Sequence, residues 1–356
     1  MDFKNYIDTN INYLENLKEK EFIVKKKKNL HLVKYPYLRN VFDETWQRYC
    51  RGCIIDSTNN KILCIPPIKA ILYDESMNFK QNYKCQPLID GTMVNMFFYD
   101  EKWIISSRSE IGGNNKWNHK SIFNMVKDCC DYNKLCNCLD KTCCYSFVMN
   151  HKSIRNISNI VTNKLTLVEQ YNLDTLIHVE TFTDVPCDTI QYIPVLNRTV
   201  TDIINEFIDS SKNDFNKKGI TFKWENKRIN ILNKKYVEVK KTFGVNTDNI
   251  LYKFVDIKKN GKLNEYIDLY PEHNDKFTLY SYLYDTLCND LLSTYHELFI
   301  HKTMIKTEVK YQLNPLIYMI HKHYLDKNEY INKKYIDNFV KQLDIQRLVF
   351  TLKYYI

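Results

Sequence analysis

Apolar side chains in the first twenty residues recur at helical spacing. They are Phe3, Ile7, Ile11, Leu14 and Leu17. Because an α-helix repeats about every 3.6 residues, this spacing places them all on one face. The sequence therefore predicts one amphipathic helix over residues 2–20.

From about residue 30 the pattern changes to short apolar runs separated by turn residues, which is typical of β-strands. Cys53–Ile55 and Ile62–Ile65 flank a Ser-Thr-Asn-Asn turn and predict a hairpin. Further hairpins are predicted at 92–109 and 219–232, core strands at 142–150 and 164–172, and helices at 117–130 and 198–210.

After Tyr236 the pattern changes again, to long segments with helical periodicity and few glycines. These segments are 262–270, 274–300, 304–323 and 334–350. We expect an α+β domain over residues 1–243, with the N-terminal helix included, followed by an all-α domain over residues 244–356.

Composition narrows the class of protein. A hydrophobic fraction of 44% is typical of a globular chain, and no apolar run reaches the ~18 residues of a spanning helix. The start of the chain lacks an apolar signal core, so we expect a cytoplasmic protein without a membrane partner. Lys+Arg 51 against Asp+Glu 42 gives a net charge of +9, which permits a polyanionic partner.

Several short motifs occur in a definite order along the first domain. An Arg-Gly pair opens a strand, an Asp-Gly pair precedes an alternating strand, and a Ser-Arg pair closes that hairpin. A later strand containing Phe leads into a basic segment. The residues are Arg51, Gly52, Asp90, Gly91, Ser107, Arg108, Phe147, Arg155 and Arg228. Each motif alone is a weak signal, but their order and spacing together are more specific.

This set resembles the adenylyltransferase domain of bacteriophage-type RNA ligases, and it looks closest to the ligase-like proteins of large cytoplasmic DNA viruses. The resemblance covers about residues 30–243. It implies an antiparallel, two-sheet nucleotidyltransferase fold of the ATP-grasp-like, RNA ligase kind. In such ligases a motif lysine attacks the ATP α-phosphate and forms a phosphoramide. Two carboxylates hold the ribose and a metal ion, and a final lysine pair neutralises charge on the phosphates.

The departures from that pattern fall on the residues that carry the chemistry. The nucleophile position, two residues before Asp90, is Leu88. The two carboxylate positions are Val148 and Lys218. The paired lysines fall on Asn230 and Leu232, although a later placement at 238–240 would keep one lysine. The resemblance then implies a retained fold without nucleotidyl transfer by the usual route, and no cofactor.

The residues that do match are the ones that the resemblance assigns to nucleotide or RNA binding. Each arginine could equally be part of an ion pair. Phe147 lies in an apolar run, which favours core packing over base stacking. Gly52 and Gly91 are expected where the backbone requires glycine.

Another lysine could have replaced the lost nucleophile. Lys84 lies four residues before Leu88, and Lys218 and Lys223 flank a later strand, with Lys84 and Lys218 the main candidates. A relocated nucleophile would need a lowered pKa and in-line access to the phosphate, with ATP and Mg²⁺ as cofactors.

A group of cysteines offers a possible zinc site. The four candidate ligands are Cys129, Cys130, Cys136 and Cys138. Their spacing is not the paired Cys-x-x-Cys of common zinc sites, and buried free cysteine also behaves as a small hydrophobe. We therefore expect no metal here.

The favoured function is that of a catalytically degenerate RNA ligase-like protein, which binds RNA, another nucleic acid or a nucleotide without adenylylation. One alternative is an active ATP-dependent RNA or polynucleotide ligase with a relocated lysine. The other is a viral structural or interaction protein, in the host cytoplasm or the virion. Basic residues mixed with tyrosine at 301–325 could contact RNA, but chance mixing in a Lys- and Tyr-rich chain explains them as well. The sequence leaves the oligomeric state open.

Overall fold

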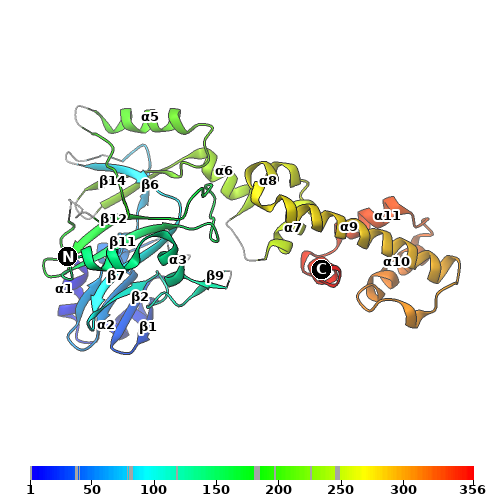
Figure 1. Cartoon of the computed structure of the whole chain (residues 1–356), viewed down its shortest axis with the longest axis horizontal. Coiled ribbons are helices and arrows are strands. Elements are labelled where there is room, and N and C mark those ends of the chain that lie inside the picture. The colour runs from blue at the N-terminus through cyan, green and yellow to red at the C-terminus, as the bar shows by residue number, and fades with distance from the viewer. Residues whose placement is uncertain are drawn as a thin grey trace. The chain divides into compact units, whose positions relative to one another are not determined.

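The computed structural model describes residues 2–36, 39, 41–77, 79, 83–117, 119–179, 185–195, 198–224, 227–244 and 249–356. The chain divides into two compact units, Met1–Asn246 and Thr247–Ile356. The first is built mainly from sheets and the second from helices (Figure 1).

The N-terminal segment forms two helices, α1 (Asp2–Thr9) and α2 (Tyr13–Glu19), where the sequence predicted one. The break follows from Asn10, whose side-chain amide donates to the Tyr6 carbonyl at 2.7 Å and so competes with the helical backbone pattern. Ile11 is 97% exposed and leaves the apolar face. The prediction of a single helix over residues 2–20 was wrong in this respect.

These helices pack on a four-stranded antiparallel sheet with the order β1-β2-β3-β4. Its strands are β1 (Ile23–Lys27), β2 (Leu30–Lys34), β3 (Arg51–Asp56) and β4 (Lys61–Cys64). A 3₁₀ turn, η1 (Thr45–Tyr49), leads into β3. Phe3, Leu17 and Leu32 are fully buried in the shared core.

A five-stranded sheet with the order β13-β12-β11-β7-β8 lies next in the unit. Its strands are β7 (Thr92–Tyr99), β8 (Lys102–Ser106), β11 (Cys143–Asn150), β12 (Lys164–Asn172) and β13 (Asp188–Thr189). One face packs against α3 (Ile122–Cys129) and α4 (Tyr132–Cys138). The helix predicted at 117–130 starts only at Ile122, where Ser121 caps it, because β9 (Lys116–Trp117) and β10 (Lys120–Ser121) precede it.

A third large sheet has the order β5-β15-β14-β6. Its strands are β5 (Ile71–Leu72), β6 (Lys84–Leu88), β14 (Gly219–Trp224) and β15 (Lys227–Leu232). One face is covered by α5 (Val200–Ser211), which begins at a capping box formed by Thr199 and Asp202. α6 (Lys234–Phe243) follows β15 directly (Figure 1).

The first unit is therefore mixed α+β, as predicted, but its described residues form three large sheets and a short ribbon, and not two sheets. The additional sheet arises because residues 23–64 pair among themselves and bury their own core against α1 and α2. The strand pairs are antiparallel except for the two that involve the short strands β13 and β5.

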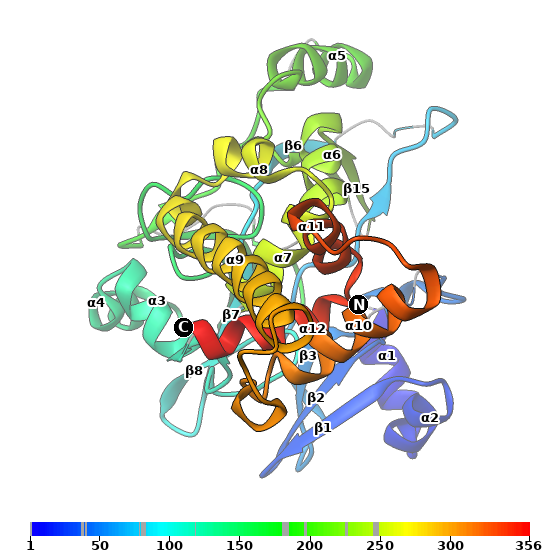
Figure 2. The same ribbon diagram turned by 90° about the vertical axis from the view of Figure 1, so that its right-hand side faces the viewer.

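The second unit contains α7 (Ile250–Lys259), α8 (Leu263–Leu269), α9 (Asn274–Tyr295), α10 (Asn314–Lys327), α11 (Lys333–Gln342) and α12 (Ile345–Leu352). Figure 2 shows the long α9 with the other helices of the unit around it. The helix predicted at 304–323 begins only at Asn314, and the one predicted at 334–350 is broken where Asp344 caps α12. Within the described residues, no helix has both the length and the apolar character needed to cross a bilayer.

Candidate functional site

The predicted nucleophile position lies at the end of β6. Leu88 pairs in register with Gly219 of β14, which in turn pairs with Leu232 of β15. Cys85 of the same strand packs into the core beneath α5, whereas Leu88 is half-buried and lines a pocket. An aliphatic side chain therefore stands where the ligase pattern requires an amine.

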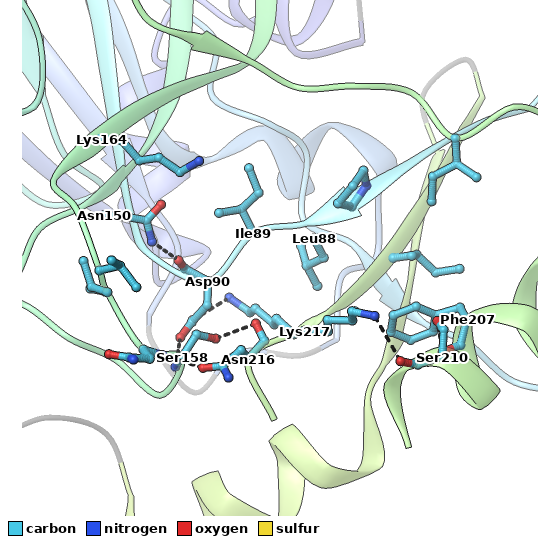
Figure 3. Close-up of a pocket in the computed structure, with 18 of the residues that line it drawn as sticks. Leu88, Ile89, Asp90, Asn150, Ser158, Lys164, Phe207, Ser210, Asn216 and Lys217 are labelled. Atoms are coloured by element: carbon cyan, nitrogen blue, oxygen red, sulfur yellow. Dashed lines mark hydrogen bonds and ion pairs between the residues drawn. The ribbon is translucent and has the colours of Figure 1, made fainter. Parts of the chain in front are cut away.

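This pocket has a volume of about 620 Å³ and opens at the end of the β6–β14 strand pair (Figure 3). Its apolar wall includes Leu88, Ile89 and Phe207 of α5, and its polar wall includes Asp90 and Lys218. We call it the Asp90 pocket. It is an open cavity, and its lining combines apolar surface with a few polar groups, as in many small-molecule sites.

The Asp90 carboxylate is buried and is surrounded by donors from the same chain. Its Oδ2 accepts hydrogen bonds from the backbone N–H groups of Ile157 (3.0 Å) and Ser158 (3.1 Å), and its Oδ1 accepts one from the Tyr236 hydroxyl (2.8 Å). Lys218 Nζ lies 3.4 Å from Oδ1. Burial alone would raise the pKa of Asp90, but Lys218 and the N–H donors hold it below its ordinary value.

Three lysines, Lys164, Lys217 and Lys218, line this pocket, and Lys218 is the one whose amine pairs with Asp90. Burial lowers its pKa, as do the nearby charges of Lys240 and Arg51, while the attraction of Asp90 opposes that shift. The neighbouring Lys217 turns away, and its Nζ donates to the Ser210 carbonyl at 3.0 Å. The lysine at the position where the resemblance implies a carboxylate is thus an ion-pair partner of Asp90.

Arg155 and Gly91 shape the backbone around Asp90. Arg155 is buried, and its guanidinium donates twice to the Ile157 carbonyl, at 3.3 and 3.2 Å. It thereby supports the loop whose N–H groups bind Asp90. A Cβ at Gly91 would lie 2.6 Å from Val148 Cγ1, so only glycine fits there.

Lys84, the other candidate for a relocated nucleophile, lies at the opposite end of β6. It lies four positions before Leu88, which corresponds to roughly 13 Å along the strand. Its Nζ lies 5.5 Å from the centre of the Tyr192 ring, and it pairs in register with Lys223. Lys84 does not line the Asp90 pocket.

A second group of charges gathers where the three large sheets meet. Arg51 begins β3, Arg108 follows β8, and Arg228 lies on β15. Burial lowers the pKa of Arg51; Tyr35 and Glu169 oppose the shift, whereas Arg228 and Arg108 add to it. We call Arg48, Arg51, Lys69, Arg108 and Arg228 the cationic junction.

Arg108 and Gly52 pack closely against one another within this junction. Arg108 donates to the Tyr35 carbonyl at 3.2 Å, and its Cζ lies 4.6 Å from the centre of the Tyr35 ring. Gly52 has a φ of +102°, and a Cβ there would lie 2.9 Å from Arg108 Cα. The preceding Ser107 is buried and accepts a hydrogen bond from the Ser109 N–H at 3.3 Å, which shapes the turn.

Arg48 and Lys69 belong to the junction but were not identified from the sequence. Arg48 Nε donates to the Lys69 carbonyl at 3.1 Å, and Lys69 Nζ lies 5.1 Å from the Tyr35 ring centre. Burial lowers the pKa of Lys69, and so do Arg108, Arg51 and Arg48. Nothing in the sequence indicates that these two residues lie together, because they come from separate segments that meet only in the folded chain.

The base of the junction is a buried ion cluster, of which the sequence pattern singles out Arg228 and Lys223 but not Glu169. Glu169 of β12 binds two cations, with Lys223 Nζ of β14 at 2.6 Å and Arg228 Nη1 of β15 on the same oxygen. Burial would raise the pKa of Glu169, but these two cations lower it. Burial likewise lowers the pKa of Lys223, to about 8, against the attraction of Glu169.

Three buried polar atoms face the space between the second and third sheets. They are Gln86 Oε1, Asn95 Nδ2 and Thr166 Oγ1, and none has a hydrogen-bond partner among the described residues. By strand alternation they lie on the faces turned away from α3 and α5, the same faces that meet at Glu169. Buried polar atoms without partners are rare, and an absent ligand or water is one explanation for them.

Phe147 lies on the opposite face of its strand. It is fully buried in the core beneath α3, with its ring 6.3 Å from that of Tyr145. It therefore does not contact the space between the sheets, which differs from the binding role that the resemblance implies.

The residues around Leu88 do not fit Mg²⁺. The two carboxylate positions hold Val148 and Lys218, and the Asp90 carboxylate is engaged by donors of the chain. Asn230 accepts a hydrogen bond from Thr221 Oγ1 at 2.6 Å, so an amide stands at the first of the paired lysine positions.

The cysteine group does not form a metal site in the described residues, where no three metal-binding side chains come together. Cys129 donates to the Asn150 carbonyl at 3.6 Å, and Cys130 to the Val126 carbonyl at 3.6 Å. Burial raises the pKa of both thiols, to about 12 and about 11, as expected for cysteines packed in a core. Cys136 packs against the same core, and Cys138 is exposed.

Comparisons with known proteins find only distant similarity. No protein-family model matches the sequence, and neither does any curated protein. Among solved structures, an apo mutant of Naegleria gruberi RNA ligase matches at 13% identity with a TM-score of 0.34, over 44% of this chain and 50% of that one. A mutant of the same ligase with ATP and Mn matches at 12% identity with a TM-score of 0.33, over 45% and 51%.

An Aquifex aeolicus protein assigned as an ATP-dependent DNA ligase matches over more of the chain. The match covers 92% of this chain and 85% of that one, at 12% identity and a TM-score of 0.40. The chain thus spans about half the length of the Naegleria structures and most of the Aquifex structure. These are low overlaps, and they carry no argument about function.

Proposed function

We propose that this chain is an RNA ligase-like protein that binds RNA or a nucleotide without becoming adenylylated. The observation that carries the proposal is the cationic junction. Burial lowers the pKa of the Arg51 guanidinium, and the nearby charges of Arg228 and Arg108 lower it further. Gathering like charges in a place with reduced solvent costs free energy, and a bound polyanion would offset that cost.

The unpartnered polar atoms between the sheets support a ligand that also carries hydrogen-bonding groups. Gln86 offers an amide oxygen, Asn95 an amide N–H, and Thr166 a hydroxyl. A nucleobase presents complementary donors and acceptors, and its phosphates match arginine. Together they favour a nucleotide or RNA over a simple inorganic anion.

The absence of covalent chemistry is proposed from the Asp90 pocket. Leu88 cannot form a phosphoramide, and Lys218 is paired with Asp90. A protonated, ion-paired amine is not a nucleophile. The retained fold would then serve binding.

Equilibrium binding of labelled single-stranded RNA tests the proposal. We expect binding that weakens steeply with salt and that falls about tenfold in Arg51→Gln, which corresponds to the loss of one charged phosphate contact. Lys334→Gln, an exposed lysine in the second unit, is the control for a general loss of charge. Absence of RNA and nucleotide binding at every salt concentration would instead favour a structural or virion protein.

A second candidate function is nucleotidyl transfer through Lys218, and one observation favours it. Gly219 pairs with Leu88, so Lys218 reaches the pocket from the strand next to the lost nucleophile. Its pKa is lowered by burial, as an activated amine requires. Incubation with ATP labelled at the α-phosphate decides the matter: an acid-labile label on the wild type that is absent from Lys218→Arg would establish this function. The arginine keeps the ion pair but forms no phosphoramide.

A further inference from the structure

The second unit contains a basic groove that the proposed function does not use. It has a volume of about 560 Å³ and lies between α7, α9 and α11. Its lining residues are Lys258, Lys259, Tyr284, Asp285, Asn289, Lys333, Asp337 and Lys341. Helices far apart in the sequence thus bring lysines to both sides of one hollow.

The charges of this groove do not balance. Four lysines face two aspartates, so the lining carries a formal charge of 4 − 2 = +2. Asp337 is also engaged within the groove, where Lys333 Nζ lies 3.5 Å from its carboxylate one turn away on α11. The groove therefore keeps a positive potential.

Neutral partners hold several of these ammonium groups in place. Lys258 Nζ lies 4.5 Å from the centre of the Tyr284 ring, and Lys333 Nζ donates to Asn289 Oδ1 at 2.7 Å. Lys259 donates to the Leu343 carbonyl. Such contacts fix the positions of the charges without cancelling them, which lowers the entropy cost of binding an anion.

We propose that this groove binds the phosphate backbone of a nucleic acid, as a second contact beside that of the first unit. The choice of a nucleic acid as the ligand rests on the proposed function. The site itself is inferred from the geometry and charge of the groove. Lysine ammonium groups bind phosphates as point charges without reading the sequence. A polymer can contact both units whatever their relative placement, and this favours a nucleic acid strand over a small anion. The groove lies apart from the basic segment at 301–325, in which Lys310 pairs with Asp290 at 3.0 Å.

Fluorescence anisotropy of the full chain with a labelled, mixed-sequence single-stranded RNA tests the groove. The groove variant combines Lys258→Gln with Lys341→Gln. The control variant combines Lys276→Gln with Lys334→Gln, two exposed lysines outside both the groove and the segment 301–325, with the same total loss of charge. For two lost phosphate contacts on a single strand, we expect the slope of log K against log salt to decrease in magnitude by about 1.4 in the groove variant. The control should keep the wild-type slope.

Equal slopes in the groove and control variants would overturn the proposal. Failure of the proposed function has a different signature, namely that Arg51→Gln leaves RNA affinity unchanged or that the wild type binds no RNA. If poly-glutamate rather than RNA binds in a way that depends on Lys258 and Lys341, the partner is an acidic protein and the proposal is wrong.

Discussion

The Asp90 pocket and the cationic junction lie in the same unit but handle charge in opposite ways. In the pocket, the Asp90 carboxylate has a cation and three hydrogen-bond donors from its own chain. In the junction, Arg51 lies near the like charges of Arg228 and Arg108. Glu169 is the counter-charge, and it pairs directly with Arg228. A charged group whose partners all come from the same chain stabilises the fold. A cluster with excess positive charge is instead stabilised by binding an anionic ligand.

This difference bears on the proposed function. Leu88 and Lys218 stand at two positions where the resemblance implies a lysine and a carboxylate, and Lys218 forms an ion pair with Asp90. The two regions still interact weakly, because the charge of Arg51 helps to lower the pKa of Lys218. The two regions should nevertheless respond differently to the same kind of substitution.

The largest effect is expected for Glu169→Gln at the base of the junction. The substitution leaves Lys223 and Arg228 buried without a counter-charge, which costs about 3–5 kcal/mol of unfolding free energy. Denaturant unfolding measures the loss. Asp188→Asn is the control, because its ion pair with Lys164 is exposed and should contribute less than about 1 kcal/mol. Similar losses in the two variants would contradict the buried cluster.

A smaller loss is expected for Lys218→Gln in the Asp90 pocket. The buried carboxylate keeps its N–H and hydroxyl donors but loses its cation, and we expect a cost of about 1–3 kcal/mol. Arg51→Gln in the junction should change stability by less than about 0.5 kcal/mol or raise it, because it removes a like charge from a cluster. Thermal unfolding of the two variants, measured side by side, compares their losses of stability. Equal destabilisation by the two substitutions would show that the pocket and the junction do not differ in how their charges are balanced.

Lowering the pH should reduce the free energy of unfolding, because Glu169 becomes protonated. Its pKa falls from 4.5 in the unfolded chain to about 2 in the folded one, so the unfolded chain binds more protons between these values. The stability supplied by this group is complete above pH 4.5 and is lost as the pH falls towards 2. Unfolding free energy measured across this window should drop more steeply in the wild type than in Glu169→Gln. Identical slopes would show that Glu169 does not titrate with the fold.

The smallest effect is expected for Leu88→Lys, namely no gain of adenylylation. The introduced amine would enter a pocket lined by Lys218, and Lys218 and Val148 occupy the two positions where the resemblance implies carboxylates. Incubation with ATP labelled at the α-phosphate should leave this variant unlabelled. A labelled band would show that the later motifs have been placed wrongly.

The sequence predicted the elements whose signal is local. The strands of the hairpins around 53–65 and 219–232 follow from short apolar runs and turn residues, and the change to helices after residue 244 follows from periodicity. The break in the N-terminal helix was missed because the apolar spacing continued through Asn10 and Ile11, while a single side-chain hydrogen bond decided the backbone.

The candidate site could be predicted only in part, because some of its residues lie in no sequence motif. Arg51, Arg108 and Arg228 were named from the sequence because they lie in recognisable motifs, and their binding of a ligand stays a prediction. Glu169 and Lys69 carry no motif, and their importance comes from tertiary contacts between separate strands. The pairing of Lys218 with Asp90 required knowledge of the register between β6 and β14.

Intact mass spectrometry of the wild-type chain after incubation with ATP, GTP or NAD⁺ and a divalent metal tests the central claim most directly. We predict an unmodified mass with each nucleotide, in a sample that still binds RNA. A nucleotidyl adduct on the wild type that disappears in Lys218→Arg would contradict the claim, since it would show that the amine beside Asp90 still forms a covalent bond.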